Sequence, residues 1–262
     1  MKRTEQLQRL HSGLSGKYDV IIIGGGATGL GTALDSVTRG FKTLLLEKSD
    51  FASGTSSRST KLVHGGVRYL ARMDLMLVTE ALRERGLMLR NAPHLTSDQE
   101  FIIPVYSWFD AVLYTTGLKF YDILSGRLSL GKSYFINRKK VIERLPDIKP
   151  DGLKGGIVYH DGQFDDARMA ISMAKACVKH GGTVLNYFEV MALLKDKEGR
   201  IEGVDACDLV TGEKYNIKSS LVINCTGVFA DEIIHMDTPE AKRMIKPSQG
   251  VHLVFDRSFL NG

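Results

Sequence analysis

The stretch that decides the fold is Tyr18–Gly29, which reads YDVIIIGGGATG. Its first half is a short run of apolar and β-branched residues, which is typical of a buried parallel strand. Gly24, Gly26 and Gly29 then follow the spacing G-x-G-x-x-G. In this pattern the first glycine allows a tight turn, the second lets a pyrophosphate approach the backbone, and the third lets a helix pack closely on the strand. The stretch therefore predicts a dinucleotide-binding turn.

The residues after this turn predict a helix and a second strand. Apolar residues recur at helical spacing from Ala27 to Val37, and Gly40 is a suitable end for the helix. Residues 42–47, KTLLLE, read as a second buried strand, which completes a βαβ unit. Glu47 closes that strand at the spacing of a carboxylate that accepts hydrogen bonds from ribose hydroxyls and repels a 2′-phosphate. A solvated charge at a strand end is the alternative interpretation of Glu47.

A second informative stretch is Thr55–Leu70, TSSRSTKLVHGGVRYL. Its hydroxyls and backbone amides are suited to a pyrophosphate, and Gly65-Gly66 would let the backbone approach a flat ring. His64 and Arg68 lie four residues apart and share a face if this turn is helical. A guanidinium beside a titratable imidazole suits an anionic hydroxy-substrate. A Ser/Thr loop with a structural histidine is the alternative.

The later part of the chain separates FAD from NAD. Short strands with turn signals alternate over residues 183–217, and LVINC then runs into Thr226-Gly227. The run VHLVF at residues 251–255 predicts one more strand. A strand ending in such a turn returns beneath the cofactor in flavoproteins of the glutathione-reductase and D-amino-acid-oxidase type, and the segment around Val190 resembles the one whose backbone meets the adenine. We therefore expect an α/β fold with a Rossmann-like FAD-binding domain of this type. It includes a β-meander and the start of a mixed α+β substrate domain.

Composition sets outer limits on the function. The chain has 262 residues, with 35 basic and 30 acidic side chains and a net charge of +5. That excess favours an anionic substrate or an acidic membrane surface, but it is too small to indicate nucleic acid. The three cysteines have no metal-ligand spacing, so no metal is expected. No run of about 18 apolar residues predicts a membrane span. Residues 1–17 are expected to form an arm packed on the body. Residues 18–262 are expected to form the FAD-binding domain, interleaved with an incomplete substrate domain at about residues 95–160 and 235–262.

Four segments together resemble the flavin-dependent glycerol-3-phosphate dehydrogenases. YDVIIIGGGATGLG, LLLEKSDFASGTSSRSTKLVHGGVRYL, APHL and DDARM follow one another as in that family, and the resemblance extends from Tyr18 to Phe255. It implies oxidation of sn-glycerol 3-phosphate to dihydroxyacetone phosphate by hydride transfer to N5 of FAD, with electrons passed to a quinone. It also implies a protein of the cytoplasm, peripheral at the inner face of the cell membrane, with a homodimer among its possible states. Family members continue beyond residue 262, so we expect this chain to be an amino-terminal fragment.

The resemblance also implies roles for individual residues. The residues expected near the substrate or the flavin face are His64, Arg68, Tyr69 and His252. The expected FAD contacts are Gly24, Gly26, Ala27, Thr28, Gly29, Glu47, Lys48, Thr55, Ser56, Ser57, Ser59, Leu62, His64, Gly65, Gly66, Val190, Thr226 and Gly227. The DDAR motif of residues 165–168 is interpreted as a helix start with an acidic first turn. A glycerol-3-phosphate oxidase that uses oxygen, a related amine or amino-acid oxidoreductase, and an inactive FAD-binding fragment stay open as alternatives.

Overall fold

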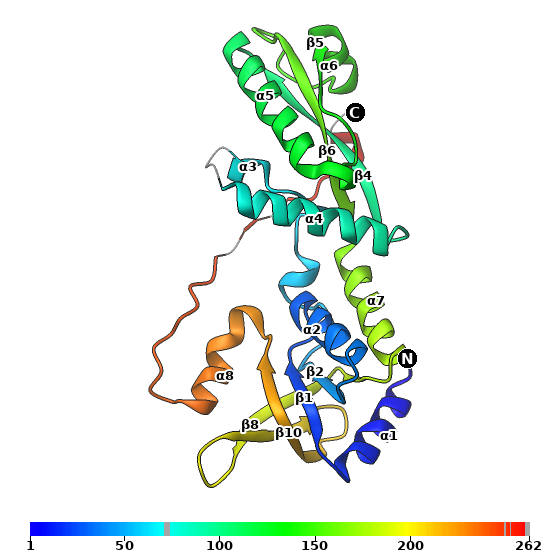
Figure 1. The fold of residues 1–262 in the computed structure, drawn as a ribbon, viewed down its shortest axis with the longest axis vertical. Coiled ribbons are helices and arrows are strands. Elements are labelled where there is room, and N and C mark those ends of the chain that lie inside the picture. Colours follow the sequence, from blue (N-terminus) through cyan, green and yellow to red (C-terminus); the bar gives the residue numbers. More distant parts are fainter. Residues whose placement is uncertain (71–73, 249, 252, 260–262) are drawn as a thin grey trace. The chain divides into compact units, whose positions relative to one another are not determined.

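The structure, a computed structural model, describes residues 1–70, 74–248, 250–251 and 253–259 (Figure 1), without the side chains of residues 68, 70 and 257. Two compact units make up the chain. The first unit comprises Met1–Ser59 and Asp166–Gln249, and the second comprises Thr60–Asp165 and Gly250–Gly262. Each unit is described by itself below.

The first unit is built on a six-stranded sheet with the order β7-β2-β1-β10-β9-β8. Four strands, β7, β2, β1 and β10, run parallel, and β10, β9 and β8 continue as an antiparallel meander. The strands are β1 (Tyr18–Ile23), β2 (Thr43–Leu46), β7 (Thr183–Leu185), β8 (Phe188–Lys195), β9 (Ile201–Asp208) and β10 (Lys214–Asn224). The predicted βαβ unit and the predicted meander are confirmed. The run predicted as a separate strand at 221–225 is the end of the longer β10, whose first half pairs with β9 and whose second half pairs with β1.

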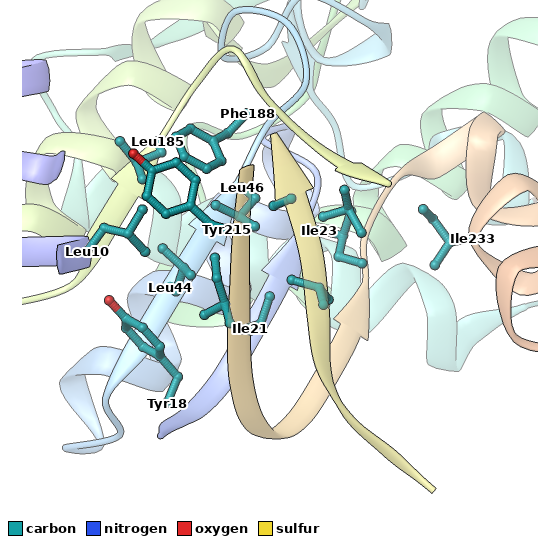
Figure 2. Packing of buried hydrophobic residues seen from close by; sticks show 14 residues of the cluster. Leu10, Tyr18, Ile21, Ile23, Leu44, Leu46, Leu185, Phe188, Tyr215 and Ile233 are labelled. Atoms are coloured by element: carbon teal, nitrogen blue, oxygen red, sulfur yellow. The ribbon is translucent and has the colours of Figure 1, made fainter. Parts of the chain in front are cut away.

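Alternation of side chains along the parallel strands gives the first unit two apolar faces. Val20 and Ile22 of β1 point to a cluster shared with α2 (Ala27–Thr38) and α7 (Asp166–Lys179). Ile21 and Ile23 point to the opposite cluster, where the meander and Leu10 of α1 (Arg3–Leu14) pack (Figure 2). The remaining helical segments of this unit are η1 (Thr55–Ser57), η3 (Gly227–Phe229) and α8 (Ala230–Asp237).

The second unit contains a sheet centred on β6 (Gly155–Phe164). β3 (Leu62–Val63), β4 (Thr96–Val105) and β5 (Tyr134–Asn137) all pair antiparallel with β6. The helical segments are α3 (Val67–Leu70), α4 (Leu75–Asn91), α5 (Trp108–Ser125), η2 (Gly126–Leu128), α6 (Arg138–Arg144) and η4 (Arg257–Phe259). α4 and α5 contribute Val78, Leu82 and Leu118 to a core that also includes Ile157 of β6.

One predicted strand is absent from the described part of the second unit. Residues 251–255 read as a strand in the sequence, but Val251 and 253–255 carry no regular secondary structure. Val251, Leu253 and Val254 are 82%, 73% and 94% exposed. A strand exists only where its backbone groups pair with a neighbour, and the described residues supply no partner here. The prediction for this segment is therefore wrong.

Candidate functional site

Two glycines shape the turn between β1 and α2. Gly24 has a φ of +109°, and a Cβ placed there would lie 2.5 Å from the carbonyl oxygen of Cys225. A Cβ on Gly29 would lie 1.9 Å from the carbonyl oxygen of Gly24, so only glycine lets α2 pack this closely on the turn. The structural roles predicted for Gly24 and Gly29 are therefore observed. Contact of either residue with a dinucleotide stays a prediction.

Gly25 is a tightly packed position that the motif did not mark. A Cβ on Gly25 would lie 2.7 Å from Cβ of Glu47 and 2.9 Å from the ring of Phe51. The Gly25 N–H donates to the Glu47 carboxylate at 2.5 Å, and the Gly25 carbonyl accepts from the Ala52 N–H at 3.0 Å. The signal that could have found it is that Gly25 is the middle one of three consecutive glycines, in a position that the spacing rule leaves free.

Gly26 is the N-cap of α2, and it leaves the start of this helix approachable. Its backbone is extended, and a Cβ would meet only Ser56, at 3.0 Å from Oγ and 3.9 Å from Cβ. The Ala27 N–H donates to the same Ser56 Oγ at 2.8 Å, and Ala27 and Thr28 are exposed. Amide donors and the positive end of the helix dipole thus lie where an anion can reach them, as the phosphate-binding prediction requires.

Glu47 follows β2 and holds the neighbouring loop together. One carboxylate oxygen accepts from Gly25 N–H, and the other accepts from Ser49 N–H at 2.7 Å. The backbone of Glu47 also pairs with Phe188 and with Leu185, both at 2.8 Å, so the carboxylate starts from a fixed main chain. The adjacent Lys48 forms an ion pair with Glu189 at 2.7 Å, and the hydrogen bond and charge of Glu189 raise the pKa of Lys48.

These residues line a cleft of about 660 Å³ within the first unit, here called the strand-end cleft. The predicted cofactor residues that line it are Gly24, Gly26, Ala27, Thr28, Glu47, Lys48, Thr55, Ser56, Val190, Thr226 and Gly227. They come from the carboxyl ends of β1, β2 and β10 and from β8. Ligands of open α/β sheets bind in such a crevice outside the carboxyl ends of the strands.

The turn after β10 forms one wall of the strand-end cleft. Asn224 Oδ1 accepts from the N–H of Thr226 at 3.2 Å and from its hydroxyl at 2.7 Å, while Asn224 Nδ2 donates to the carbonyl of Ala230. Gly227 has a φ of +60°. Cys225 also lines the cleft, and burial raises the pKa of its thiol. Asn224 was missed by sequence reasoning, since a polar residue at a strand end carries no local signal of its role.

Apolar residues of α8 and the segment after it also line the cleft. Ile233 and Met236 line the cleft together with Ile245, whose N–H donates to Asp231 at 3.1 Å. Residues from 235 onward were expected to belong to the substrate domain, and no motif marks them. The amphipathic spacing of Ile233 and Met236 is the one signal that indicates a buried face here.

Two further predicted cofactor residues belong to the loop that follows this site. The hydroxyl of Ser59 donates to Asp166 at 2.7 Å, and Asp166 is 4% exposed at the first turn of α7. Asp166 also accepts from the Ala167 N–H at 2.8 Å. The DDAR motif therefore starts a helix, as predicted, and in addition ties down the loop that contains Ser57 and Ser59.

The remaining predicted site residues belong to the second unit. Leu62 lies in β3, His64 and Tyr69 are exposed, and Gly65 and Gly66 are buried. α3 begins only at Val67, because Gly66 adopts a φ of +74°. The shared helical face expected for His64 and Arg68 is therefore wrong. The Arg68 side chain and the whole of His252 lie outside the described residues.

The described residues contain neither a metal-binding group nor a membrane-spanning helix. No group of three or more His, Cys, Asp or Glu side chains among them is arranged to hold a metal ion. None of the helices within the described ranges has the length and apolar character that crossing a bilayer requires.

Comparison with known proteins identifies the family. The family described as FAD dependent oxidoreductase, DAO, matches residues 19–261. This chain belongs to the FAD-dependent oxidoreductase family. The predicted recognition and fold class are thereby confirmed, since the strand order and meander described above occur in a chain that matches this family over nearly its whole length.

Relatives within this family are glycerol-3-phosphate dehydrogenases. The chain is 46% identical over 254 residues to the mitochondrial enzyme of Schizosaccharomyces pombe, covering 91% of this chain and 39% of the relative. It is 43% identical over 264 residues to the mitochondrial enzyme of Homo sapiens, covering 96% and 36%. The chain therefore spans well under half the length of the curated relatives it matches.

Solved structures agree on the fold. The structure of glycerol-3-phosphate dehydrogenase from Bacillus halodurans complexed with FAD is 32% identical, with a TM-score of 0.68, and the match covers 89% of this chain and 39% of that one. L-proline dehydrogenase from P. horikoshii is 19% identical with a TM-score of 0.65, over 86% of this chain and 57% of that one, which shows a shared fold alone.

Proposed function

We propose that this chain binds FAD and forms part of an FAD-dependent glycerol-3-phosphate dehydrogenase, which oxidises sn-glycerol 3-phosphate to dihydroxyacetone phosphate. The observation that carries the proposal is the strand-end cleft. It brings the bare backbone of Gly26, the amide donors of α2 and the carboxylate of Glu47 to one edge of a parallel sheet. The relatives named above supply the substrate.

The residues of the cleft fit an FAD dinucleotide. Gly26 leaves room for a pyrophosphate, because a Cβ there would have Ser56 as its one near neighbour. The N-terminal amides of α2 would donate to the phosphates. Glu47 would accept from the ribose hydroxyls, and the backbone at Val190, which is 6% exposed, would meet the adenine.

The chemistry divides between cofactor and protein. FAD, when bound, supplies the hydride acceptor for C2 of the substrate. A protein base, His64 or His252, would take the proton of the C2 hydroxyl, so that loss of hydride and proton together leaves the ketone. Arg68 would bind the phosphate, because its planar fork can donate to two oxygens at once. Tyr69, which is 41% exposed, would complete this side of the site.

Anaerobic flavin reduction tests the proposal. The purified chain should retain FAD with its visible absorbance and bind nicotinamide dinucleotides far more weakly. In the full-length protein, glycerol 3-phosphate should reduce the flavin and so bleach its visible absorbance. Arg68→Ala should slow that reduction about 10- to 150-fold with glycerol 3-phosphate, the loss of one charge-assisted contact, and much less with glycerol. Tight nicotinamide binding without flavin absorbance would refute the proposal.

The electron acceptor and the location form the second part of the proposal. Electrons would pass to a membrane quinone, so reduced enzyme should reduce a soluble quinone analogue faster than it releases peroxide under air. Peroxide as the main product would instead indicate an oxidase. A role in glycerol metabolism and a homodimer belong to the same proposal, and light scattering of the full-length protein tests the latter.

Exposed apolar residues of α5 support a peripheral membrane attachment. Trp108, Phe109 and Ile123 are 62%, 75% and 74% exposed, whereas Tyr121 of the same helix is 2% exposed. Aromatic and aliphatic side chains at the surface of a helix favour the membrane interface. The inner face of the cell membrane is the proposed location, although the relatives are named mitochondrial. Phe109→Asp with Ile123→Asp should abolish co-sedimentation with anionic vesicles, and unchanged sedimentation would refute this role for α5.

A further inference from the structure

A buried charged cluster in the second unit lies directly beneath Gly65. The Gly65 N–H donates to Asp161 Oδ1 at 3.2 Å. The Tyr121 hydroxyl donates to the same carboxylate, at 3.0 Å from Oδ1 and 3.2 Å from Oδ2. Arg85 Nη1 forms an ion pair with Asp161 Oδ1 at 2.6 Å. Asp161 therefore accepts from a backbone amide, a phenol and a guanidinium. The proposed chemistry does not use the side chains of Asp161, Tyr121 or Arg85.

The cluster is almost completely removed from water. Arg85, Tyr121 and Asp161 are 1%, 2% and 3% exposed. Arg85 also donates to the His160 carbonyl at 3.2 Å and to the Ser125 hydroxyl at 3.4 Å, and its guanidinium carbon lies 5.7 Å from the centroid of the Tyr121 ring. Removing two charges from water is costly, and an apolar pair of similar volume is often equally stable. Stability alone therefore gives no reason for charges at this position.

What the charges provide is an acceptor for the Gly65 backbone. A Cβ on Gly65 would lie 2.3 Å from Leu82 and 2.4 Å from the Tyr121 oxygen, so the main chain rests directly on the cluster. His64, one residue earlier, is exposed, and Gly66 turns the chain into α3 with a φ of +74°. The hydrogen bond to Asp161 thus fixes the peptide between an exposed imidazole and a buried turn.

Tyr121 is suited to hold the carboxylate in place. Burial, and after it the charge of Asp161, raise the pKa of Tyr121. The phenol therefore stays protonated at neutral pH and remains a donor. With Arg85 bound to Oδ1 and the Tyr121 hydroxyl near both oxygens, the Asp161 carboxylate is held with Oδ1 toward the Gly65 N–H.

We propose that Asp161, Arg85 and Tyr121 are positioning residues that fix the backbone of the His64-Gly65-Gly66 segment for contact with bound FAD. The proposal rests on the FAD-binding function proposed above. It assigns the cluster a role in the geometry of this segment, which is separate from a role in the stability of the unit.

The test replaces the ion pair by apolar residues. Arg85→Met with Asp161→Leu keeps the volume and removes both charges, and the Gly65 N–H and Tyr121 hydroxyl lose their acceptor, so the melting temperature should fall by only a few degrees. Amide hydrogen exchange of peptides covering residues 62–67, measured in the chain without added FAD, should become at least about tenfold faster, the factor for one hydrogen bond to a charged group. Peptides of β4 and the middle of β6 should keep their exchange rates.

Two tyrosine variants provide the matched comparison. Tyr121→Phe removes one donor to Asp161 and keeps the ring, so exchange at residues 62–67 should rise by a smaller factor. Tyr106→Phe removes a hydroxyl in the same unit that donates to the Lys149 carbonyl at 3.0 Å and touches no member of the cluster. It should leave exchange unchanged. Should the double variant fail to fold, the contrast between these two variants decides the question.

The readout with FAD bound separates positioning from stability. The double variant should alter the visible circular dichroism of the flavin and weaken FAD binding at least about tenfold, although its melting temperature falls by only a few degrees. Unchanged exchange, or faster exchange with an unaltered flavin spectrum and affinity, overturns the positioning role while FAD binding by the parent chain stands. Failure of the parent chain to bind FAD overturns the proposed function and this inference together.

Discussion

In both the turn at Gly24–Gly29 and the segment His64–Gly66, a carboxylate fixes a glycine backbone, but the two carboxylates lie in different surroundings. In both, a glycine backbone is pressed onto a neighbour: a Cβ on Gly25 would lie 2.7 Å from Glu47, and one on Gly65 would lie 2.3 Å from Leu82. In both, an amide donates to a carboxylate. Glu47 lies at the edge of a cleft, however, whereas Asp161 is buried.

The two carboxylates, of Glu47 and Asp161, differ in whether a ligand could reach them. Glu47 lines the strand-end cleft, so in the proposed function ligand hydroxyls can reach its carboxylate. Asp161 is held away from solvent by Arg85 and Tyr121, so its geometry does not depend on a ligand. In the proposed function the first anchor therefore takes part in binding FAD, and the second supports a segment that does.

The largest effect is expected where two backbones touch. Gly29→Val places a Cβ about 1.9 Å from the Gly24 carbonyl oxygen, and neither main chain can yield without separating α2 from β1. We expect the free energy of unfolding of the first unit to fall by about 3 kcal/mol or more, as in severe overpacking. Urea denaturation measures it. Gly31→Ala is the control in the same helix: nothing lies within 4 Å, and the loss of a helical glycine should stabilise by about 0.5–1 kcal/mol.

The next effect tests the role of Gly26 at the start of α2. Gly26→Val meets only Ser56 at 3.0 Å, so the fold should survive with a small change in stability. The side chain would displace a phosphate from the amides of α2, and losing one such contact corresponds to about 1.5–3 kcal/mol. FAD affinity should therefore fall about 10- to 150-fold, measured by flavin fluorescence titration. Unchanged flavin stoichiometry would contradict this placement of the dinucleotide.

The comparison also explains what the sequence could reveal. Gly24–Gly29 and Glu47 were found because the strand, turn, helix and second strand follow one another within a short stretch. The anchor of Gly65 was not found, because Asp161 lies 96 positions further along the chain and carries no local signal. The contact exists only after β3 pairs with β6, which is a tertiary event.

The second unit was harder to predict for reasons visible in its elements. α5 is apolar on several faces, and it exposes Trp108 and Phe109 while burying Leu118. A helix without one polar face has no clear period in the sequence. β4 begins with polar residues and contains Pro104, which lowers any strand prediction. Residues 251–255 show the opposite error, since an apolar run predicts a strand whether or not a partner is present.

A smaller effect tests whether Glu47 anchors the loop before any ligand binds. Glu47→Gln keeps one oxygen for an amide but removes the charge that strengthens both hydrogen bonds, to Gly25 and Ser49. The unfolding free energy without FAD should fall by about 1 kcal/mol. Glu189→Gln removes a like charge at the same cleft but touches neither amide, and its exposed pair with Lys48 should contribute less. Equal losses of unfolding free energy in the two variants would contradict a specific anchoring role for Glu47.

The last prediction uses alkaline pH to separate the two anchors. Burial raises the pKa of Tyr121 above its ordinary value of 10, so the folded chain holds a proton there that the unfolded chain releases. The associated stability is present below pH 10 and is lost as the pH rises, by about 1 kcal/mol at pH 11. Tyr121→Phe should flatten this part of the stability curve, whereas Tyr106→Phe should keep its slope. In the parent chain, the amides of residues 62–67 should lose protection against hydrogen exchange over the same pH range. The Gly25 amide, whose carboxylate partner has no phenol beside it, should keep its protection relative to the intrinsic exchange rate. Identical alkaline slopes in all three chains would show that Tyr121 ionises as freely as an exposed phenol and does not hold Asp161.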